Sequence, residues 1–374
     1  MSGKLKRSQA SGYLPDPAPG LAQVHRVREA GSDVLDYIAL DRNERVSPFP
    51  EWFMDEVREN LTSAVLSRYP VQDQLHRQLA QQLQVPEECL ILTPSSDSAF
   101  KSLFEAYVQP GDGVVMLEPS YAMFPVYTRM FLGKAVEISY GPDMELDTER
   151  LLDSATAGVK LLLIANPNQP TGTLLDETVL RQLIERAAEV GALVVVDEAY
   201  HPFSHATALP WLATYPNLVV VRTFSKSAGL AGLRLGFAAG HPEVCANLFK
   251  VRAANDLNSM AIMCASLILK HPQVVDDYVA EVQEGGRLLA DRSRALGLVP
   301  LPTHTNFMLI RVAHRCPPDS LVEALKQRGF LIKGPVDAPS VAGCVRVTLG
   351  PPDLMSNFAD RLDEALSQVS FQPG

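Results

Sequence analysis

The chain has 374 residues, 47% of them hydrophobic, and a formal net charge of −10, so it can fill the cores of one large and one smaller domain. The negative charge argues against a nucleic-acid partner, because that kind of affinity depends on basic residues. No apolar run approaches the roughly 20 residues of a membrane span, so no membrane association is expected.

The termini and the cysteines predict a cytoplasmic protein. Basic residues near the N-terminus are followed by no apolar stretch, so no signal peptide is indicated. Residues 1–30 are polar and contain several prolines, and we expect a mobile N-terminal arm there. No Cys-x-x-Cys pair occurs, so we expect neither a metal site nor a disulfide framework. The five cysteines, expected to be reduced, are Cys89, Cys245, Cys264, Cys316 and Cys344.

The first motif along the chain is the charged segment from Asp41 to Arg45, which follows the apolar residues 37–40 and contains Asn43. An ordinary charged turn explains its arginines equally well. Tyr69 stands farther on, just before a stretch with helical spacing of its leucines. A surface tyrosine before a helix is the simpler interpretation of that position. The leucines concerned are Leu75, Leu79 and Leu83.

A short apolar strand at 91–93 runs into a hydroxyl-rich segment at 94–98, and a helix is expected from there to Val108. Ser96 and Asp97 lie where that helix begins. Free amides and hydroxyls at a helix N-terminus form an anion site. Simple capping of the helix by Ser96 or Asp97 is the alternative, and both roles are compatible.

Strands and helices then alternate, which predicts an α/β fold with a largely parallel sheet and right-handed crossovers. Val114 to Leu117 is one strand, and Tyr121 follows its end. The segment from Asp176 to Val190 reads as an amphipathic helix. Further strands are expected at 135–139, 161–165, 193–196, 218–221 and 233–238.

Two of these strands end in polar motifs. Asn-Pro-Asn-Gln-Pro-Thr-Gly at 166–172 is a rigid loop in which Asn168 and Gln169 offer neutral hydrogen bonds. The apolar strand at 192–196 ends at Asp197, where open α/β sheets bind ligands, and Tyr200 follows. Capping of a following helix is the alternative role for Asp197.

The segment from Val221 to Gly236 predicts a covalent cofactor. Lys226 can form a Schiff base with an aldehyde, and Thr223, Ser225 and Arg234 suit a phosphate. A phosphate-bearing aldehyde with these partners is pyridoxal 5′-phosphate (PLP). Asp197 would keep its ring nitrogen protonated, and Tyr200 can reach its phenolic oxygen. A strand end with a solvated lysine is the alternative.

After Gly240 the pattern becomes helical, with one long connecting helix expected at 273–296. A smaller α+β domain follows, with strands at 306–312, 330–333 and 344–349 and helices at 320–328 and 354–369. We therefore expect a small domain made of residues 31–60 plus 270–374 and a large cofactor-binding domain at 61–269.

These motifs, taken together, resemble those of the fold-type I PLP-dependent aminotransferases of class I/II. They are most similar to the histidinol-phosphate aminotransferase branch, and the resemblance runs from about Asp41 to Gly350. The motifs that carry it are Asn43-Glu44, Arg68-Tyr69-Pro70, Ser96-Asp97, Pro119-Ser120-Tyr121, the 166–172 loop, Asp197-Glu198-Ala199-Tyr200, Ser225-Lys226, Arg234 and Arg346-Val347-Thr348.

The resemblance implies roles that the residues alone do not give. Tyr121 would stack on the cofactor ring, where a core aromatic is the alternative. Tyr69 would reach the cofactor phosphate of the other subunit, which implies a homodimer. The family places an asparagine immediately before Pro-Thr-Gly, but here that residue is Gln169, and Asn168 is an alternative donor. The family also carries glycine at or beside Ser95, so the path of that loop is open.

For the substrate, the resemblance assigns Arg346 to a carboxylate, with an exposed strand charge as the alternative. Asn43 would stand at the substrate entrance, and Asn306 would line the pocket. Lys333 stands where histidinol-phosphate aminotransferases carry an arginine for the substrate's phosphate. It keeps the charge but loses the planar fork, and a solvated lysine is the alternative.

The implied activity is transfer of an amino group between an amino acid, or an amino-alcohol phosphate, and a 2-oxo acid by Schiff-base exchange at Lys226. The freed lysine would act first as the general base and then as the general acid. Two other functions use the same scaffold: a PLP-dependent decarboxylase or lyase, and a non-catalytic PLP-binding module.

Overall fold

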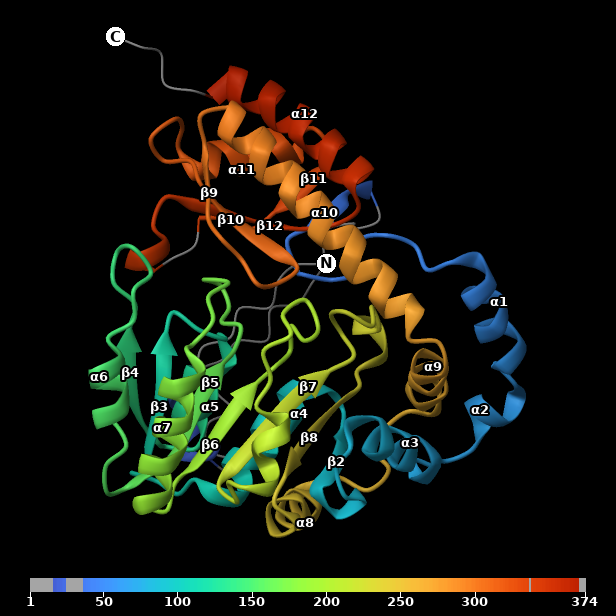
Figure 1. Cartoon of the computed structure of the whole chain (residues 1–374), viewed down its shortest axis with the longest axis vertical. Helices are drawn as coiled ribbons and strands as arrows, with labels where there is room; N and C mark the ends of the chain where they lie inside the picture. The colour runs from blue at the N-terminus through green and yellow to red at the C-terminus, as the bar shows by residue number, and fades with distance from the viewer. Residues whose placement is uncertain (1–15, 25–35, 336–337, 370–374) are drawn as a thin grey trace, which may run out of the picture.

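The computed structural model describes residues 16–24, 36–335 and 338–369. Figure 1 shows two bodies joined by the long helix α10 (Gln273–Ala295). The sheet body, below, is built around a seven-stranded sheet. The C-terminal body, above, holds the smaller sheets and the last helices.

The large sheet has the strand order β2-β8-β7-β6-β5-β3-β4. Every neighbouring pair is parallel except the two that include β8, which is antiparallel to β2 and to β7. The expected largely parallel sheet is therefore confirmed. Its strands are β2 (Leu90–Thr93), β3 (Gly113–Glu118), β4 (Lys134–Ser139), β5 (Val159–Ala165), β6 (Leu193–Asp197), β7 (Leu218–Thr223) and β8 (Gly236–Gly240).

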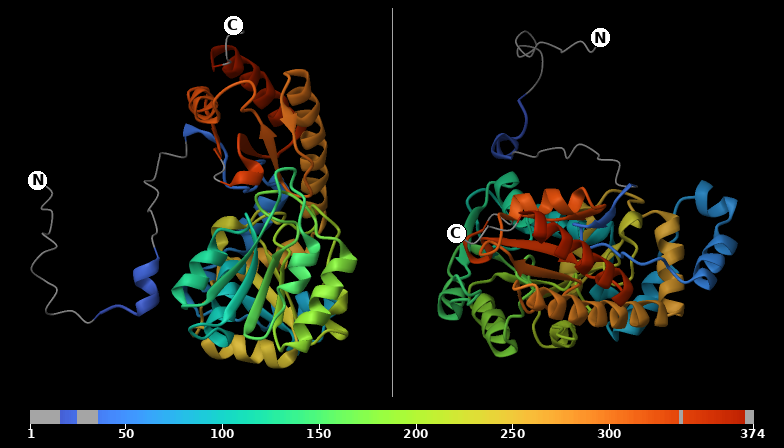
Figure 2. Two further views of the ribbon diagram at one scale, coloured as in Figure 1. Left: turned by 90° about the vertical axis from the view of Figure 1, so that its left-hand side faces the viewer. Right: turned by 90° about the horizontal axis from the view of Figure 1, so that it is seen from above.

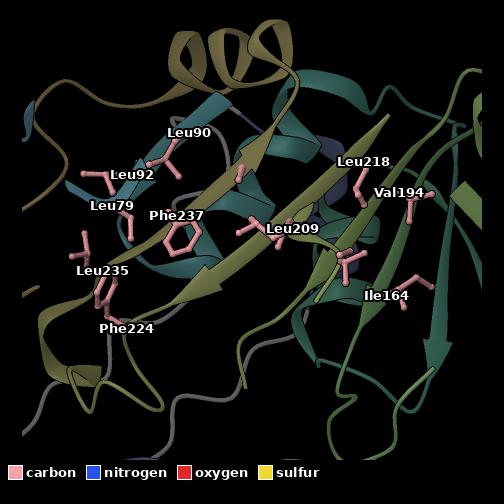
Figure 3. Packing of buried hydrophobic residues seen from close by; sticks show 14 of the residues in the cluster. Leu79, Leu90, Leu92, Ile164, Val194, Leu209, Leu218, Phe224, Leu235 and Phe237 are labelled. Atoms are coloured by element: carbon pink, nitrogen blue, oxygen red, sulfur yellow. The ribbon is translucent and has the colours of Figure 1, made fainter. Parts of the chain in front are cut away.

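Helices cover both faces of this sheet, which explains why its central strands are apolar without alternation. Leu162, Val194 and Leu218 pack on one face with α3, α7 and α9, whereas Leu161 and Val195 pack on the other with α4, α5 and α8. Figure 3 shows part of the first cluster. The helices are α3 (Asp73–Leu83), α4 (Ser95–Tyr107), α5 (Met123–Met130), α6 (Thr148–Asp153), α7 (Glu177–Glu189), α8 (Pro242–Val251) and α9 (Ser259–Lys270).

The C-terminal body has its own apolar core between α10, α12 and the small sheets. β1 (Ile38–Leu40) pairs in parallel with β11 (Phe330–Ile332), so a segment from the first part of the chain packs within the C-terminal body. β10 pairs with β9 and β12, antiparallel to both. The remaining elements are α11 (Pro318–Lys326), α12 (Pro352–Val369), β9 (Val299–Pro300), β10 (Phe307–Arg311) and β12 (Cys344–Thr348).

Two short helices, α1 (Glu51–Asn60) and α2 (Ser63–Ser67), lead from the C-terminal body to the sheet body along one flank of the molecule (Figure 1). Short 3-10 turns complete the elements. They are η1 (Pro19–Gln23), η3 (Glu87–Cys89), η4 (Leu209–Ala213), η5 (Ala231–Leu233) and η6 (Pro339–Val341).

Most expected elements are found within a few residues of their predicted bounds, including the helices at 176–190 and 273–296. The strand expected at 233–238 was placed too early, because β8 begins at Gly236. The turn η5 occupies the preceding residues, and Arg234 then takes the left-handed conformation with φ of 57°. A left-handed residue cannot extend a strand, so the strand starts after it.

The expected N-terminal arm lies mostly outside the described residues. Within it, η1 packs against α5, and Gly20 is buried there. A Cβ atom on Gly20 would lie 2.0 Å from the Met130 carbonyl oxygen, so only glycine allows this close approach. Figure 2 shows η1 on the side of the sheet body. In the described part of the chain, none of the helices combines the length and apolarity that crossing a membrane requires.

Candidate active site

A cavity of about 190 Å³ lies at the carboxyl ends of β5, β6 and β7, where an open α/β sheet binds its ligand. A larger hollow of about 430 Å³ lies between α10 and β9, but the titratable residues predicted from the sequence gather in the smaller one. The predicted residues that line it are Ser96, Asp97, Tyr121, Gln169, Asp197, Tyr200, Thr223, Ser225, Lys226 and Arg234.

Lys226 follows the end of β7 and donates a hydrogen bond from its Nζ to the carbonyl oxygen of Arg42, at 3.1 Å. Burial lowers the pKa of this amine to about 8, and the charge of Arg346 adds to that effect, while Glu44 and Asp197 oppose it. An amine with a lowered pKa has a larger neutral fraction near pH 7. Lys226 is therefore suited to act as a nucleophile.

Asp197 is the last residue of β6, and its Oδ1 accepts a hydrogen bond from the amide of Ala199 at 3.0 Å. A turn follows instead of a helix, so the capping alternative does not apply. Burial raises the pKa of this carboxyl group to about 7, and Glu198 and Asp97 raise it further. A buried carboxylate that forms no ion pair within the described chain suits a cationic ligand group.

Hydroxyl groups and a guanidinium surround the other end of the cavity. Thr223 Oγ1 lies 2.9 Å from Ser225 Oγ, and Arg234 Nη1 lies 3.5 Å from the same atom. The N-terminus of α4 lies at the same cavity, because Ser95, Ser96 and Asp97 also line it. Amides, hydroxyls and a guanidinium together form a site for a phosphate.

The structure shows the backbone path at Ser95, which the sequence alone did not predict. Ser95 has φ of 80°, the left-handed region that a glycine adopts without strain. The N-cap residue is Pro94, which provides no side-chain cap, so capping by Ser96 or Asp97 is not the role of these residues. Asp97 instead accepts a hydrogen bond from the hydroxyl of Tyr121 at 3.1 Å, which fixes the ring beside the cavity.

The two neighbouring amides of the 166–172 loop, here called the amide loop, have different roles. Gln169 lines the cavity, and its Oε1 accepts a short hydrogen bond from the Tyr200 hydroxyl. Asn168 is buried and bonds to Ser120, Thr171 and the carbonyl of Pro119 at 2.8–2.9 Å. Asn168 is thus engaged in holding the loop, whereas Gln169 is the amide that faces the cavity.

Arg346, Asn306 and Asn43 come together behind Tyr200. The amide nitrogen Nδ2 of Asn43 donates to the Tyr200 hydroxyl at 2.9 Å, and that of Asn306 donates to the carbonyl of Asn43 at 3.0 Å. Arg346 donates from Nη2 to the carbonyl of Asp41 at 2.7 Å, but its buried Nε has no partner among the described residues. A buried, unpaired guanidinium donor suits an anionic ligand.

Six predicted residues do not line this cavity: Asn168, Arg346, Asn306 and Asn43, described above, and also Lys333 and Tyr69. Lys333 pairs through its backbone with Arg346, and its side chain is exposed. Tyr69 lies between α2 and α3 and is 81% exposed. Within one chain, neither side chain lines the cavity around Lys226.

The sequence did not reveal one buried ion pair beside the site. Glu198 follows Asp197, Arg222 precedes Thr223, and the two side chains bond at 2.8 Å. The signal lies in the strand register, because Asp197 pairs with Val221 and places the next residues of both strands side by side. Opposite charges one step beyond the last paired residues of two adjacent parallel strands, here Asp197 and Val221, therefore predict the pair.

Comparison with known proteins agrees with this geometry. A family model described as aminotransferase class I and II matches residues 36–362. The chain belongs to the aminotransferase class I and II family. It is thus an aminotransferase, and the decarboxylase and the non-catalytic module are the less favoured alternatives.

Curated relatives of this aminotransferase match over most of their length. The chain is 32% identical over 346 residues to the histidinol-phosphate aminotransferase of Symbiobacterium thermophilum, which covers 91% of this chain and 93% of that protein. It is 34% identical over 338 residues to the histidinol-phosphate aminotransferase of Gloeobacter violaceus, with 86% and 90% covered.

Solved structures give the fold of this aminotransferase. The histidinol-phosphate aminotransferase of Sinorhizobium meliloti, in complex with PLP, matches with a TM-score of 0.83 at 22% identity, covering 95% of this chain and 98% of that one. The aspartate aminotransferase of Thermus thermophilus with maleate matches with a TM-score of 0.76 at 23% identity, covering 98% and 100%. The fold is that of the fold-type I PLP-dependent enzymes.

The cavity of this aminotransferase fits PLP. The site of amides, hydroxyls and guanidinium matches the phosphate of the cofactor. The buried carboxylate of Asp197 matches a protonated ring nitrogen, and the Lys226 amine, whose pKa burial lowers, matches the aldehyde. The aminotransferase is accordingly PLP-dependent.

Proposed function

We propose that this aminotransferase moves an amino group between an amino acid, or an amino-alcohol phosphate, and a 2-oxo acid, with Lys226 as the residue that carries the proton. One observation carries the proposal: a buried lysine amine, a buried carboxylate and a phosphate site meet in one cavity. PLP, when bound, supplies an aldehyde that takes up the amino group and a ring that withdraws electrons from the substrate carbon.

The side chains around that group have separate tasks in this proposal. The incoming amine displaces Lys226. The Nζ of Lys226 then takes a proton from the α-carbon of the substrate and would give a proton to the carbon that was the aldehyde carbon of PLP. Asp197 holds a proton on the ring nitrogen. Tyr200 and Gln169 hydrogen-bond near the phenolic oxygen, and Tyr121 stacks on the ring. The phosphate is held by the backbone amides of Ser96 and Asp97, by the hydroxyls of Thr223 and Ser225 and by Arg234, with Asn168 supporting the amide loop.

We propose Arg346 as the residue that binds the substrate carboxylate, because its buried Nε has no partner in the described part of the chain. Asn306 and Asn43 lie beside it and complete this half of the site. Lys333 lies next to Arg346 in the strand pairing and is proposed to select an anionic side group. The curated relatives named above are histidinol-phosphate aminotransferases, which makes histidinol phosphate one candidate substrate.

We propose that the active enzyme is a homodimer with composite sites. Leu66, Tyr69 and Val71 are 71–81% exposed and form an apolar surface next to Phe249, which shares a hollow with Pro70. Such a surface on a monomer marks an interface. A second copy of the chain would cover it and would receive Tyr69 at the phosphate of its own cofactor, so that symmetry gives two equivalent sites.

The same proposal includes the division of the chain and its location. We take residues 31–60 plus 270–374 as the small domain and 61–269 as the large domain. The two apolar clusters support this division for most of the chain, although Phe53 of α1 packs with the large sheet and Tyr200 and Phe203 pack with the C-terminal body. Unpaired, mostly buried cysteines support a cytoplasmic location.

The test is a screen of amino donors with the PLP-loaded protein, followed by absorbance spectroscopy and by product analysis. An aminotransferase converts the bound cofactor to its amine form with a suitable donor and returns it with a 2-oxo acid. Release of carbon dioxide without such a conversion would favour the decarboxylase instead. A cofactor spectrum that responds to no donor in a broad screen would favour the non-catalytic module.

A further inference from the structure

Three consecutive residues, Asp41, Arg42 and Asn43, each bond to a different functional side chain. The carbonyl of Asp41 accepts a hydrogen bond from Arg346 Nη2 at 2.7 Å, and that of Arg42 accepts one from Lys226 Nζ at 3.1 Å. The third bond runs from Asn43 Nδ2 to the hydroxyl of Tyr200 at 2.9 Å. One short segment therefore contacts the proposed carboxylate site, the lysine and the tyrosine.

This segment is held in place by the C-terminal body. β1, immediately before it, pairs with β11. The amide of Asn43 donates to Thr348 Oγ1 at 3.0 Å, and the carbonyl of Asn43 accepts from Asn306 at 3.0 Å. Asn43 is 1% exposed. Since both backbone groups are fixed from one side, the amide side chain has a defined direction, toward Tyr200.

The backbone of Asn43 explains why this residue type suits the position. Its φ is 57°, in the left-handed region where asparagine is several times more frequent than most residues. Glycine accepts the same backbone without strain, but it has no side chain to reach Tyr200. The position therefore requires both a left-handed backbone and an amide donor.

We infer that Asn43 is a positioning residue for Tyr200. The hydroxyl of Tyr200 has one hydrogen to donate, which goes to Gln169 Oε1 here and would go to the phenolic oxygen once PLP is bound, and it accepts the hydrogen bond of Asn43. Accepting that bond polarises the hydroxyl and makes it a stronger donor, because linked hydrogen bonds strengthen each other. The direction in which Tyr200 donates is thus set from the C-terminal body, by a residue that belongs to none of the three strand ends that form the cavity.

This role rests on the proposed function, in which Tyr200 donates to the phenolic oxygen of bound PLP. A donor there stabilises negative charge on that oxygen, which favours loss of the proton on the nearby Lys226 nitrogen. A weaker donor should therefore raise the pH at which the visible absorbance of the bound cofactor changes. For one hydrogen bond the expected shift is about 0.4–1 pH unit.

A double-mutant cycle between Asn43→Gly and Tyr200→Phe tests the inference. Asn43→Gly retains the left-handed backbone and removes only the amide. We expect it to raise the transition pH of the absorbance in wild-type protein and to leave that pH unchanged when Tyr200 is already phenylalanine. A residue with a purely structural role would shift the transition equally in both backgrounds, and that additive result would overturn the inference.

A second variant removes the anchor instead of the residue. Thr348→Val deletes the hydroxyl that accepts from the amide of Asn43, and we expect a smaller rise in the transition pH, again absent with Tyr200→Phe. If neither variant moves the transition, Asn43 does not position Tyr200. A failure of the proposed function itself is distinguishable, because then even the unaltered protein would show no PLP absorbance that Lys226→Ala removes.

Discussion

Glu198 and Arg222 form a buried two-pronged ion pair that ties the ends of β6 and β7 together. Arg222 donates from Nε and Nη2 to Glu198 Oε2 at 2.9 and 2.8 Å. Thr207 and the amide of Ala208 also donate to Glu198, at 2.8 and 2.6 Å. The pair lies one residue beyond Asp197 and one before Thr223, so it fixes the two strand ends that carry the proposed nitrogen and phosphate contacts.

Removing one member of this pair should be costly. Arg222→Met leaves the carboxylate of Glu198 buried without a cation, and we expect a loss of about 3–5 kcal/mol in the free energy of unfolding. Denaturant titration measures it. The double variant Glu198→Leu with Arg222→Met removes both charges and should recover much of that loss. A single variant as stable as wild type would contradict the assignment.

Lys226→Ala should abolish turnover and the visible absorbance of lysine-bound PLP, because no other lysine among the described residues lines the cavity. The measurements are a transamination assay and an absorbance spectrum of the PLP-loaded variant. Lys250→Ala, on the exposed face of α8, is the matched control and should keep both signals. Normal activity in the Lys226 variant would end the proposed function.

Asp197 should make the cofactor-free protein less stable as the pH rises. Its pKa is about 7 in the folded chain against an ordinary 3.8. Between these values the unfolded chain releases a proton that the folded chain keeps. Stability therefore falls by about 1.4 kcal/mol per pH unit at most, and the loss is complete above pH 7.

Asp197→Asn should remove this loss, so its advantage over wild type should grow from pH 4 to pH 7 and then stay constant. Thermal unfolding of the cofactor-free proteins across that range measures it. Asp143→Asn, at an exposed position, is the control and should follow wild type. Parallel curves for Asp197→Asn and wild type would show that Asp197 titrates normally.

Mixed dimers test the composite site. Alone, Tyr69→Phe should be weakened and Lys226→Ala inactive, since every site of a homodimer then carries the same defect. Mixing the two variants should restore part of the activity, because one site of each mixed dimer contains both wild-type side chains. Sedimentation shows whether dimers form. Full activity of a proven monomer would rule the shared site out.

Lys333→Ala should raise KM for an acceptor with an anionic side group and spare the half-reaction with a neutral donor such as alanine. The variant lacks the positive charge of Lys333, which attracts only a substrate with an anionic side group. Stopped-flow absorbance measures the two half-reactions separately. Lys326→Ala, on α11, is the control for general surface charge. Unchanged kinetics in both half-reactions would reduce Lys333 to a solvated side chain.

The sequence alone determined the order of the elements and the identity of the central residues. Uninterrupted apolar runs predict buried parallel strands, and the neighbours of Asp197 and Lys226 in the sequence are enough to predict their chemical roles. The long helix α10 could be predicted in the same way, because few helix-breaking residues interrupt its sequence.

Only the tertiary structure decided which side chains meet. Asn43 and Thr348 bond although 305 positions separate them, and no local pattern encodes that distance. Asn168 and Gln169 are both amides in one loop, yet the fold turns one into the protein and the other toward the cavity. Periodicity and residue chemistry act over a few neighbours, whereas burial, charge pairing and the direction of a hydrogen bond depend on how distant strands pack. Strand propensity likewise could not place the start of β8, which depends on the left-handed turn at Arg234.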